Sequence, residues 1–334
     1  MARRPDLTIN EATVSPPEPS KIQQLRSLAS TPDEHGHFAI TLLNARHGIE
    51  VVLAALQVLT KKPLADARPA LLALFAHYTA RGETRDPSAF LRATIMRALR
   101  PVVQPADADL LAQATATTVF PPPTFKEEGA LLRSAALLAL AEVDENLARY
   151  HAVRLLANQY TDPMSGEPAL IAARLLAAYE EVLPLYFYVM QDGAHTVPEV
   201  VAECLRQLTR IPEPLLSSII EHFATSTSSM ALVGLFDLLL THHTGPHGLE
   251  FLRKFLHDTL EMDFYRYLVT TMVAAGNESL LVELMEAARF EQRREKIVIL
   301  QEALALLPTN PEISGLIRQL KQRVPKSTAT RKPS

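Results

Sequence analysis

One spacing of apolar residues recurs along this chain and constrains its fold more than any other feature. Apolar side chains stand at positions k, k+4, k+7 and k+8 in Leu91, Ile95, Ala98 and Leu99, and such a set lines one face of an α-helix. The spacing starts again at residues 132, 169, 200, 232 and 268, in places with a polar residue or a glycine at one position. Successive starts lie 31 to 41 residues apart. Self-similarity with this period is typical of stacked helical repeats.

A second amphipathic segment lies between successive copies of the spacing, so the sequence predicts pairs of helices. These segments are residues 145–159, 182–191, 214–224 and 249–260. A non-repetitive helical domain and a four-helix bundle are the rival folds. Bundles use fewer and longer helices, whereas this sequence contains about 14 short helical segments joined by corners that contain proline.

Two pieces of the chain carry a known family pattern. Residues 91–99 and 132–140 both read apolar-Arg-x-x-apolar-x-x-Ala-Leu, with Arg92 and Arg133 at the second position, and residues 153–157 carry the first half. Asp86-Pro87 and Asp162-Pro163 stand at corners. Over about residues 87 to 310 the chain resembles HEAT-repeat proteins. The resemblance implies an all-α fold, an α-solenoid of stacked antiparallel helix pairs in a right-handed superhelical array.

The composition and the positions of helix-capping residues predict one long helical domain with two disordered ends. Eleven glycines in 334 residues is well below the usual share of about 7%, which argues against nucleotide-binding α/β folds and β-rich folds. We expect residues 1–19 to be a disordered arm, residues 20–323 a single HEAT-like repeat domain, and residues 324–334 a disordered basic tail. Ser20 and Gln23 have capping-box spacing, and Asp86-Pro87 predicts a helix start at Pro87.

The charge distribution, the cysteine count and the lack of long apolar runs argue against nucleic-acid wrapping, disulfide or zinc sites, and membrane insertion. The last 14 residues hold five basic and no acidic side chains, so the rest of the chain carries about −9 of a net charge of −4. An acidic body disfavours wrapping of nucleic acid. The single cysteine excludes an intrachain disulfide and a multi-cysteine zinc site. No signal segment and no apolar run of membrane-spanning length is present, so we expect a cytoplasmic protein without membrane insertion.

Two histidine-containing segments are candidate metal sites. His242, His243 and His247 cluster beside two glycines, and a metal would need these rings to converge with a further ligand. A polar turn at a helix C-terminus is the favoured interpretation. The segment from Glu34 to His37 holds one Glu-x-x-His without a second copy, and a polar linker before the Phe38 helix is favoured there.

A cysteine, a pair of glutamates and three tyrosines are the remaining candidates for chemistry or partner contact. Cys204 stands at an inward template position, so we expect it in the core. Glu127 and Glu128 are adjacent and do not face each other on a helix, so we expect them on a solvated face or at a helix end. The aromatic side chains near Tyr179 fall on faces that must pack in a helix pair, so core packing or groove lining is the favoured interpretation. Tyrosines also favour interfaces, and the alternative is a partner surface made by Tyr179, Tyr186 and Tyr188.

The sequence predicts no catalytic, cofactor or metal site and therefore a non-enzyme. The common phosphate-loop, dinucleotide, zinc-protease and hydrolase motifs are absent. The expected function is a non-catalytic protein–protein interaction scaffold whose partner is another protein. A HEAT-like nucleic-acid-binding or DNA-repair protein is one alternative, although the resemblance would then imply tryptophans at the site and the chain has none. An accessory subunit of an enzyme is the other.

Overall fold

The computed structural model describes residues 20–191, 196–308 and 311–323, and within these ranges it contains α-helices, short 3-10 turns and no strand. The α-helices are α1 (Lys21–Ser27), α2 (Pro32–Leu42), α3 (Ile49–Lys61), α4 (Arg68–Thr79), α5 (Gly82–Arg85), α6 (Phe90–Leu99), α7 (Ala108–Ala116), α8 (Ala130–Ala141), α9 (Glu145–Leu156), α10 (Ala169–Ala178), α11 (Val182–Val189), α12 (Pro198–Gln207), α13 (Glu213–Phe223), α14 (Ser229–Thr241), α15 (Leu249–Asp258), α16 (Met262–Ala275), α17 (Glu278–Phe290), α18 (Arg294–Leu304) and α19 (Pro311–Arg323). The all-α prediction is confirmed. The predicted arm and tail lie outside the described residues.

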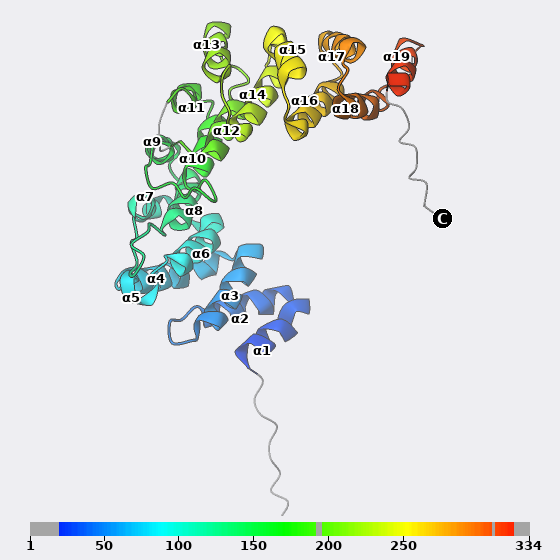
Figure 1. Cartoon of the computed structure of the whole chain (residues 1–334). Helices are drawn as coiled ribbons and strands as arrows, with labels where there is room; N and C mark the ends of the chain where they lie inside the picture. Colours follow the sequence, from blue (N-terminus) through cyan, green and yellow to red (C-terminus); the bar gives the residue numbers. More distant parts are fainter. Residues whose placement is uncertain (1–19, 192–195, 309–310, 324–334) are drawn as a thin grey trace, which may run out of the picture.

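From α6 onward the helices alternate between two rows that follow an arc (Figure 1). The even-numbered helices α6 to α18 lie on the inside of the arc, and each packs against the next one of its row. The odd-numbered helices α7 to α19 lie on the outside. Each of the six copies of the apolar spacing falls in one inner helix, from α6 to α16. These helices need an apolar face because each lies between two inner neighbours and an outer layer.

Small residues let the inner helices approach closely. Among the described glycines, the closest approach to another stretch of backbone is at Gly234 of α14, where an added Cβ would lie 2.6 Å from the Cα of Ala202 on α12 and 2.7 Å from its carbonyl oxygen. No side chain fits at that distance without moving one helix away from the other. Gly234 lies within a regular helix, whose backbone conformation any residue can adopt. Glycine is therefore required at this crossing because of the close contact and not because of the backbone conformation.

Buried ion pairs fasten the starts of two inner helices. Asp86 precedes α6 and accepts hydrogen bonds from the backbone nitrogens of Leu91 and Arg92, at 3.0 and 2.9 Å, and from Arg92 Nε at 3.1 Å. Ala89 has a φ of 55°, which turns the chain between the aspartate and the helix. The prediction that α6 begins at Pro87 is therefore wrong by three residues, because the aspartate caps the helix across an intervening turn.

The second pair joins Glu127 to Arg133 at the start of α8. Both Arg133 terminal nitrogens contact the carboxylate, at 2.6 and 2.9 Å, and Nη2 also donates to the carbonyl of Tyr160. Glu127 Oε1 accepts from the backbone nitrogens of Val119 and Gly129 as well. Because its side chain is 6% exposed, Glu127 does not lie on a solvated face, and it lies instead at a helix end, the other position expected for this pair. The carboxylate organises the loop that leads into α8.

Lys296 of α18 is another buried charged residue that pairs with backbone groups at a helix end. Its side chain is fully buried, and Nζ donates to the carbonyls of Leu256 and His257 at the end of α15, at 2.6 and 2.9 Å. The ammonium group also lies 4.8 Å from the ring centre of Tyr265. A positive charge at a helix C-terminus interacts favourably with the unpaired carbonyls there, so the lysine ties α18 to the outer row.

Two further expectations concern the N-terminal part and the membrane. Ser20 and Gln23 do form the capping box that starts α1. The segment from Glu34 to His37 is helical and lies within α2, so the expectation of a linker is wrong; Gly36 is buried there, and a Cβ on it would lie 2.5 Å from Leu64. Among the described residues no helix combines the length and the apolar character needed to cross a bilayer.

Replacing Gly234 by alanine tests the close crossing of α12 and α14. We expect Gly234→Ala to lower the free energy of unfolding by about 1–3 kcal/mol, because one helix must shift to admit the Cβ. Gly315→Ala is the matched control, since a Cβ there meets nothing within 4 Å. The substitution also replaces a conformationally flexible residue within a helix. This control should stabilise by about 0.5–1 kcal/mol. Urea unfolding followed by circular dichroism measures both, and equal effects at the two glycines would contradict the account.

Replacing Arg133 tests the buried fastening of α8. Arg133→Ala leaves the Glu127 carboxylate buried without its counter-ion, and we expect a loss of about 3–5 kcal/mol of unfolding free energy. Arg100→Ala is the control, because the Arg100–Glu142 pair is about half exposed, at 45% and 46%. Exposed pairs contribute less than about 1 kcal/mol. A cost for Arg133→Ala no larger than that of Arg100→Ala would show that the buried pair does not hold the loop.

Candidate protein-docking groove

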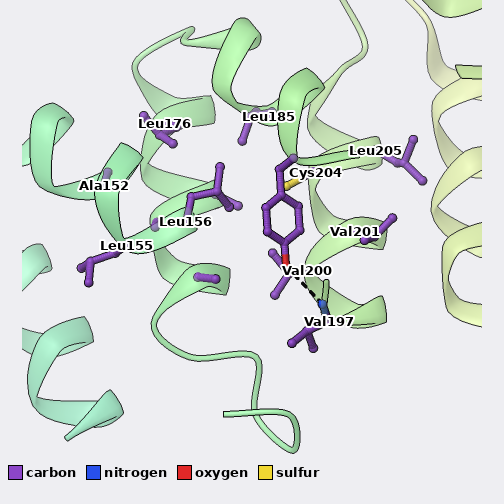
Figure 2. Packing of buried hydrophobic residues seen from close by; sticks show 14 of the residues in the cluster. Ala152, Leu155, Leu156, Leu176, Leu185, Val197, Val200, Val201, Cys204 and Leu205 are labelled. Carbon is purple, nitrogen blue, oxygen red and sulfur yellow. Dashed lines mark hydrogen bonds between the residues drawn. The ribbon is translucent and has the colours of Figure 1, made fainter. Parts of the chain in front are cut away.

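The aromatic segment at the end of α10 and along α11 does not point in one direction. Tyr188 is 5% exposed, and its hydroxyl accepts a hydrogen bond of 3.2 Å from the backbone nitrogen of Val197. Figure 2 shows Leu185, Val200 and Cys204 in the same buried cluster, with this hydrogen bond dashed. Burial raises the pKa of the Tyr188 hydroxyl. This tyrosine therefore belongs to the core between α11 and α12 and offers no exposed ring.

Tyr179 and Tyr186 are half buried. The guanidinium carbon of Arg149 lies 5.1 Å from the ring centre of Tyr179, and the same arginine contacts Glu145 at 2.6 Å and Glu181 at 2.9 Å. Burial raises the pKa of the Tyr179 hydroxyl. The Tyr186 ring packs edge-on against Phe187. Of the three tyrosines, Tyr188 alone lines the groove described below, and the partner surface made by all three stays a prediction.

An apolar groove lies between the outer helices α9 and α11. Its volume is about 330 Å³, and its lining is apolar except for Gln191. The lining residues are Val153, Leu156 and Ala157 from α9 and its end, Leu183, Pro184, Phe187 and Tyr188 from α11, and Gln191. The groove forms because α11 packs mainly on the inner helices α10 and α12 and leaves its side toward α9 open.

The groove exposes large apolar side chains to solvent. Leu183 is 60% exposed and Phe187 63% exposed, and they stand at i and i+4 on one face of α11. Tyr150, one turn before Val153 on α9, is 62% exposed. The sequence carries a signal for this surface, because the segment that forms α11 is apolar around its whole circumference. The inner helices can cover only one side of such a helix, so apolar side chains remain exposed on the other side. Contiguous exposed apolar surface of this kind marks interaction sites.

The three histidines form a hydrogen-bonded turn after α14. His242 is buried, its Nε2 lies 2.9 Å from the carbonyl oxygen of Ile211, and its Nδ1 lies 2.9 Å from the hydroxyl of Thr244. His247 Nε2 lies 2.6 Å from the same hydroxyl, and His243 Nδ1 lies 3.1 Å from the carbonyl oxygen of Thr209. The rings therefore link this turn to the end of α12, as a polar turn at a helix C-terminus would.

No cluster of three or more histidine, cysteine or carboxylate side chains within the described ranges is placed to hold a metal ion. His37 Nδ1 lies 2.8 Å from the carbonyl oxygen of Asp33, and both Glu34 and His37 are exposed on α2. Cys204 is fully buried, which confirms the expectation that it is a core residue, and burial raises the pKa of its thiol. A thiol in that setting is not an activated nucleophile.

Comparisons with family models, with curated proteins and with solved structures found no match to this chain.

Replacing His242 tests the histidine turn. Burial and the neighbouring His247 lower the pKa of His242, so the folded state binds its proton less readily than the unfolded state does. Stability is then present above the unfolded pKa of about 6.5 and is lost as the pH falls toward the folded value, by up to about 1.4 kcal/mol per pH unit. In His242→Gln, whose amide can still donate to Ile211, we expect a smaller loss of unfolding free energy between pH 7 and pH 5. Parallel pH profiles for the two proteins would contradict this assignment.

Proposed function

We propose that the chain is a HEAT-like α-solenoid that acts as a non-catalytic protein-interaction scaffold. The alternation of inner and outer helices along an arc (Figure 1) and the placement of all six template copies on inner helices support a right-handed superhelical repeat array. The observation that carries the interaction function is the apolar groove between α9 and α11, with Leu183 and Phe187 more than half exposed.

The inner row supports a protein partner over a nucleic acid. Two of its arginines already have acidic partners: Arg174 Nε lies 3.2 Å from Glu203, and Arg206 Nε lies 2.7 Å from Asp237. The hydroxyl of Tyr267 also donates a hydrogen bond to Asp237. Burial, together with this hydrogen bond, raises the pKa of Tyr267 to about 12. Arginines paired in this way have little charge left for phosphates, whose binding depends on many free basic groups.

The groove fits a partner that presents apolar side chains in a row. An amphipathic helix laid along a hydrophobic groove offers side chains at i, i+3, i+4 and i+7, and such grooves draw most of their affinity from a few buried anchors. Leu183 and Phe187 are the two side chains that would be covered.

A double substitution tests the groove. We expect Leu183→Asp with Phe187→Asp to reduce recovery of co-isolated partners from native lysate by at least about tenfold, because two charges would be buried at the contact. Leu260→Asp with Leu306→Asp is the matched control, since these leucines are 72% and 74% exposed and line no part of the groove. Quantitative mass spectrometry of both samples, after circular dichroism has verified folding, measures the difference. If both double variants retain the same partners in the same amounts, the groove is not the docking site.

A further inference from the structure

A second pocket lies where α1, α2 and α3 meet at the start of the helical array (Figure 1). The volume of this N-terminal pocket is about 350 Å³, and it shares no lining residue with the groove between α9 and α11. Its lining includes three lysine or arginine side chains and one histidine, but no acidic side chain. Residues 20–62, which form this end, hold five basic and three acidic residues, whereas the body of the chain is acidic. The N-terminal pocket therefore has an excess of positive charge.

The positive charge comes from the ends of two helices. Arg26 lies in the last turn of α1, and Lys61 and Lys62 stand at the end of α3. All three residues are exposed, and none of their side chains forms an ion pair or a hydrogen bond with another described residue. Asp33 and Glu34, the acidic residues at the start of α2, do not line the pocket. The three cations are therefore available to another molecule.

At several other joints between helices the basic side chains are bound within the fold. Arg68 contacts Asp107, Arg133 contacts Glu127, and Lys296 donates to two backbone carbonyls. A basic residue in the last turn of a helix interacts favourably with the helix dipole, which by itself accounts for a single surface cation. The dipole does not account for three cations around one apolar pocket that lacks an acidic group.

The floor of the N-terminal pocket is apolar and elongated. Ile22, Leu25 and Ala29 stand at i, i+3 and i+7 along α1 and the 3-10 turn that follows it, and Ala54 and Val58 stand at i and i+4 on α3. Seven residues of helix span about 10 Å, or two turns. The floor is therefore long enough to receive two turns of a helix, which is much longer than a single phosphate or carboxylate group.

We propose that the N-terminal pocket binds an acidic amphipathic helix of a partner protein. Apolar side chains at i, i+3 or i+4, and i+7 of that helix pack on the floor, as in other complexes of a helix with a hydrophobic groove. Its aspartate or glutamate side chains accept charge-assisted hydrogen bonds from Arg26, Lys61 and Lys62. Complementary charge of this kind speeds association and rejects basic partners. The pocket acts separately from the groove between α9 and α11, so either site can fail without the other.

Fluorescence anisotropy with the full chain and labelled peptides tests the charge requirement. The probe is a capped peptide of about 18 residues, long enough to form a helix, with leucines at i, i+4 and i+7 and glutamates beside them. A second peptide carries glutamine in place of each glutamate. We expect the glutamate peptide to bind at least about tenfold more tightly, because the glutamine peptide lacks the charge-assisted hydrogen bonds. This difference should shrink as sodium chloride is added, because salt screens exposed charges.

Charge reversal at the end of α3 ties the binding to the pocket. Lys61→Glu with Lys62→Glu should weaken binding of the glutamate peptide at least about tenfold, because like charges then face each other. Lys254→Glu with Arg294→Glu is the matched control, since it changes the net charge equally at exposed basic residues outside the pocket. The control should change the affinity by less than about twofold, because distant exposed charges are screened.

A further variant separates this pocket from the groove. Leu183→Asp with Phe187→Asp should bind the glutamate peptide as the parent chain does, and circular dichroism verifies that each variant is folded. The proposal is overturned by equal binding of the glutamate and glutamine peptides, by equal losses in the pocket and control variants, or by loss of binding in the groove variant. Absence of peptide binding also overturns it, including the case in which the chain sediments with phosphatidylserine vesicles instead.

Discussion

The structure depends on the close side-by-side packing of successive inner helices. Each of these helices places its apolar face against two neighbours of the same row and one outer layer, so no helix buries its apolar face alone. The crossing of α12 and α14 sets the tightest requirement, because Gly234 leaves no room for a Cβ against Ala202. Burial of apolar surface supplies the free energy, and small residues at such crossings allow the helices to come near enough to obtain it.

Several charged residues of this chain stabilise the joints between helices. Asp86, Glu127 and Lys296 lie at corners, where they satisfy backbone groups that a helix end leaves unpaired. Arg174 and Arg206 connect neighbouring inner helices through carboxylates in the same way. The proposed recognition surface is the groove between α9 and α11, where large apolar side chains stay exposed.

The sequence predicted the repeating part of the fold better than its corners. The spacing found at Leu91 also identifies the other inner helices, because burial on one face imposes a period that is visible in a single segment. The burial of Glu127 was not predictable in this way, since its partner Arg133 and the loop nitrogens it caps come together only when the chain folds around them. Lys296 stands at a helix start and suggests a surface residue, although its partners lie about 40 residues earlier.

The candidate site shows the same division. That the aromatic segment 179–188 is important for packing or contact was visible in its composition, but which rings face outward depends on the angle of α11 against α10 and α12. Tyr188 turned inward to Val197, whereas Phe187 stayed exposed.

Small-angle X-ray scattering from the full chain tests the central claim most directly. A compact domain of 334 residues has a radius of gyration of about 20 Å. Two rows of helices along an arc predict a clearly larger value, together with a rod-like cross-section about two helices thick, or roughly 20 Å. A radius near 20 Å with the symmetric distance distribution of a sphere would contradict the extended arrangement.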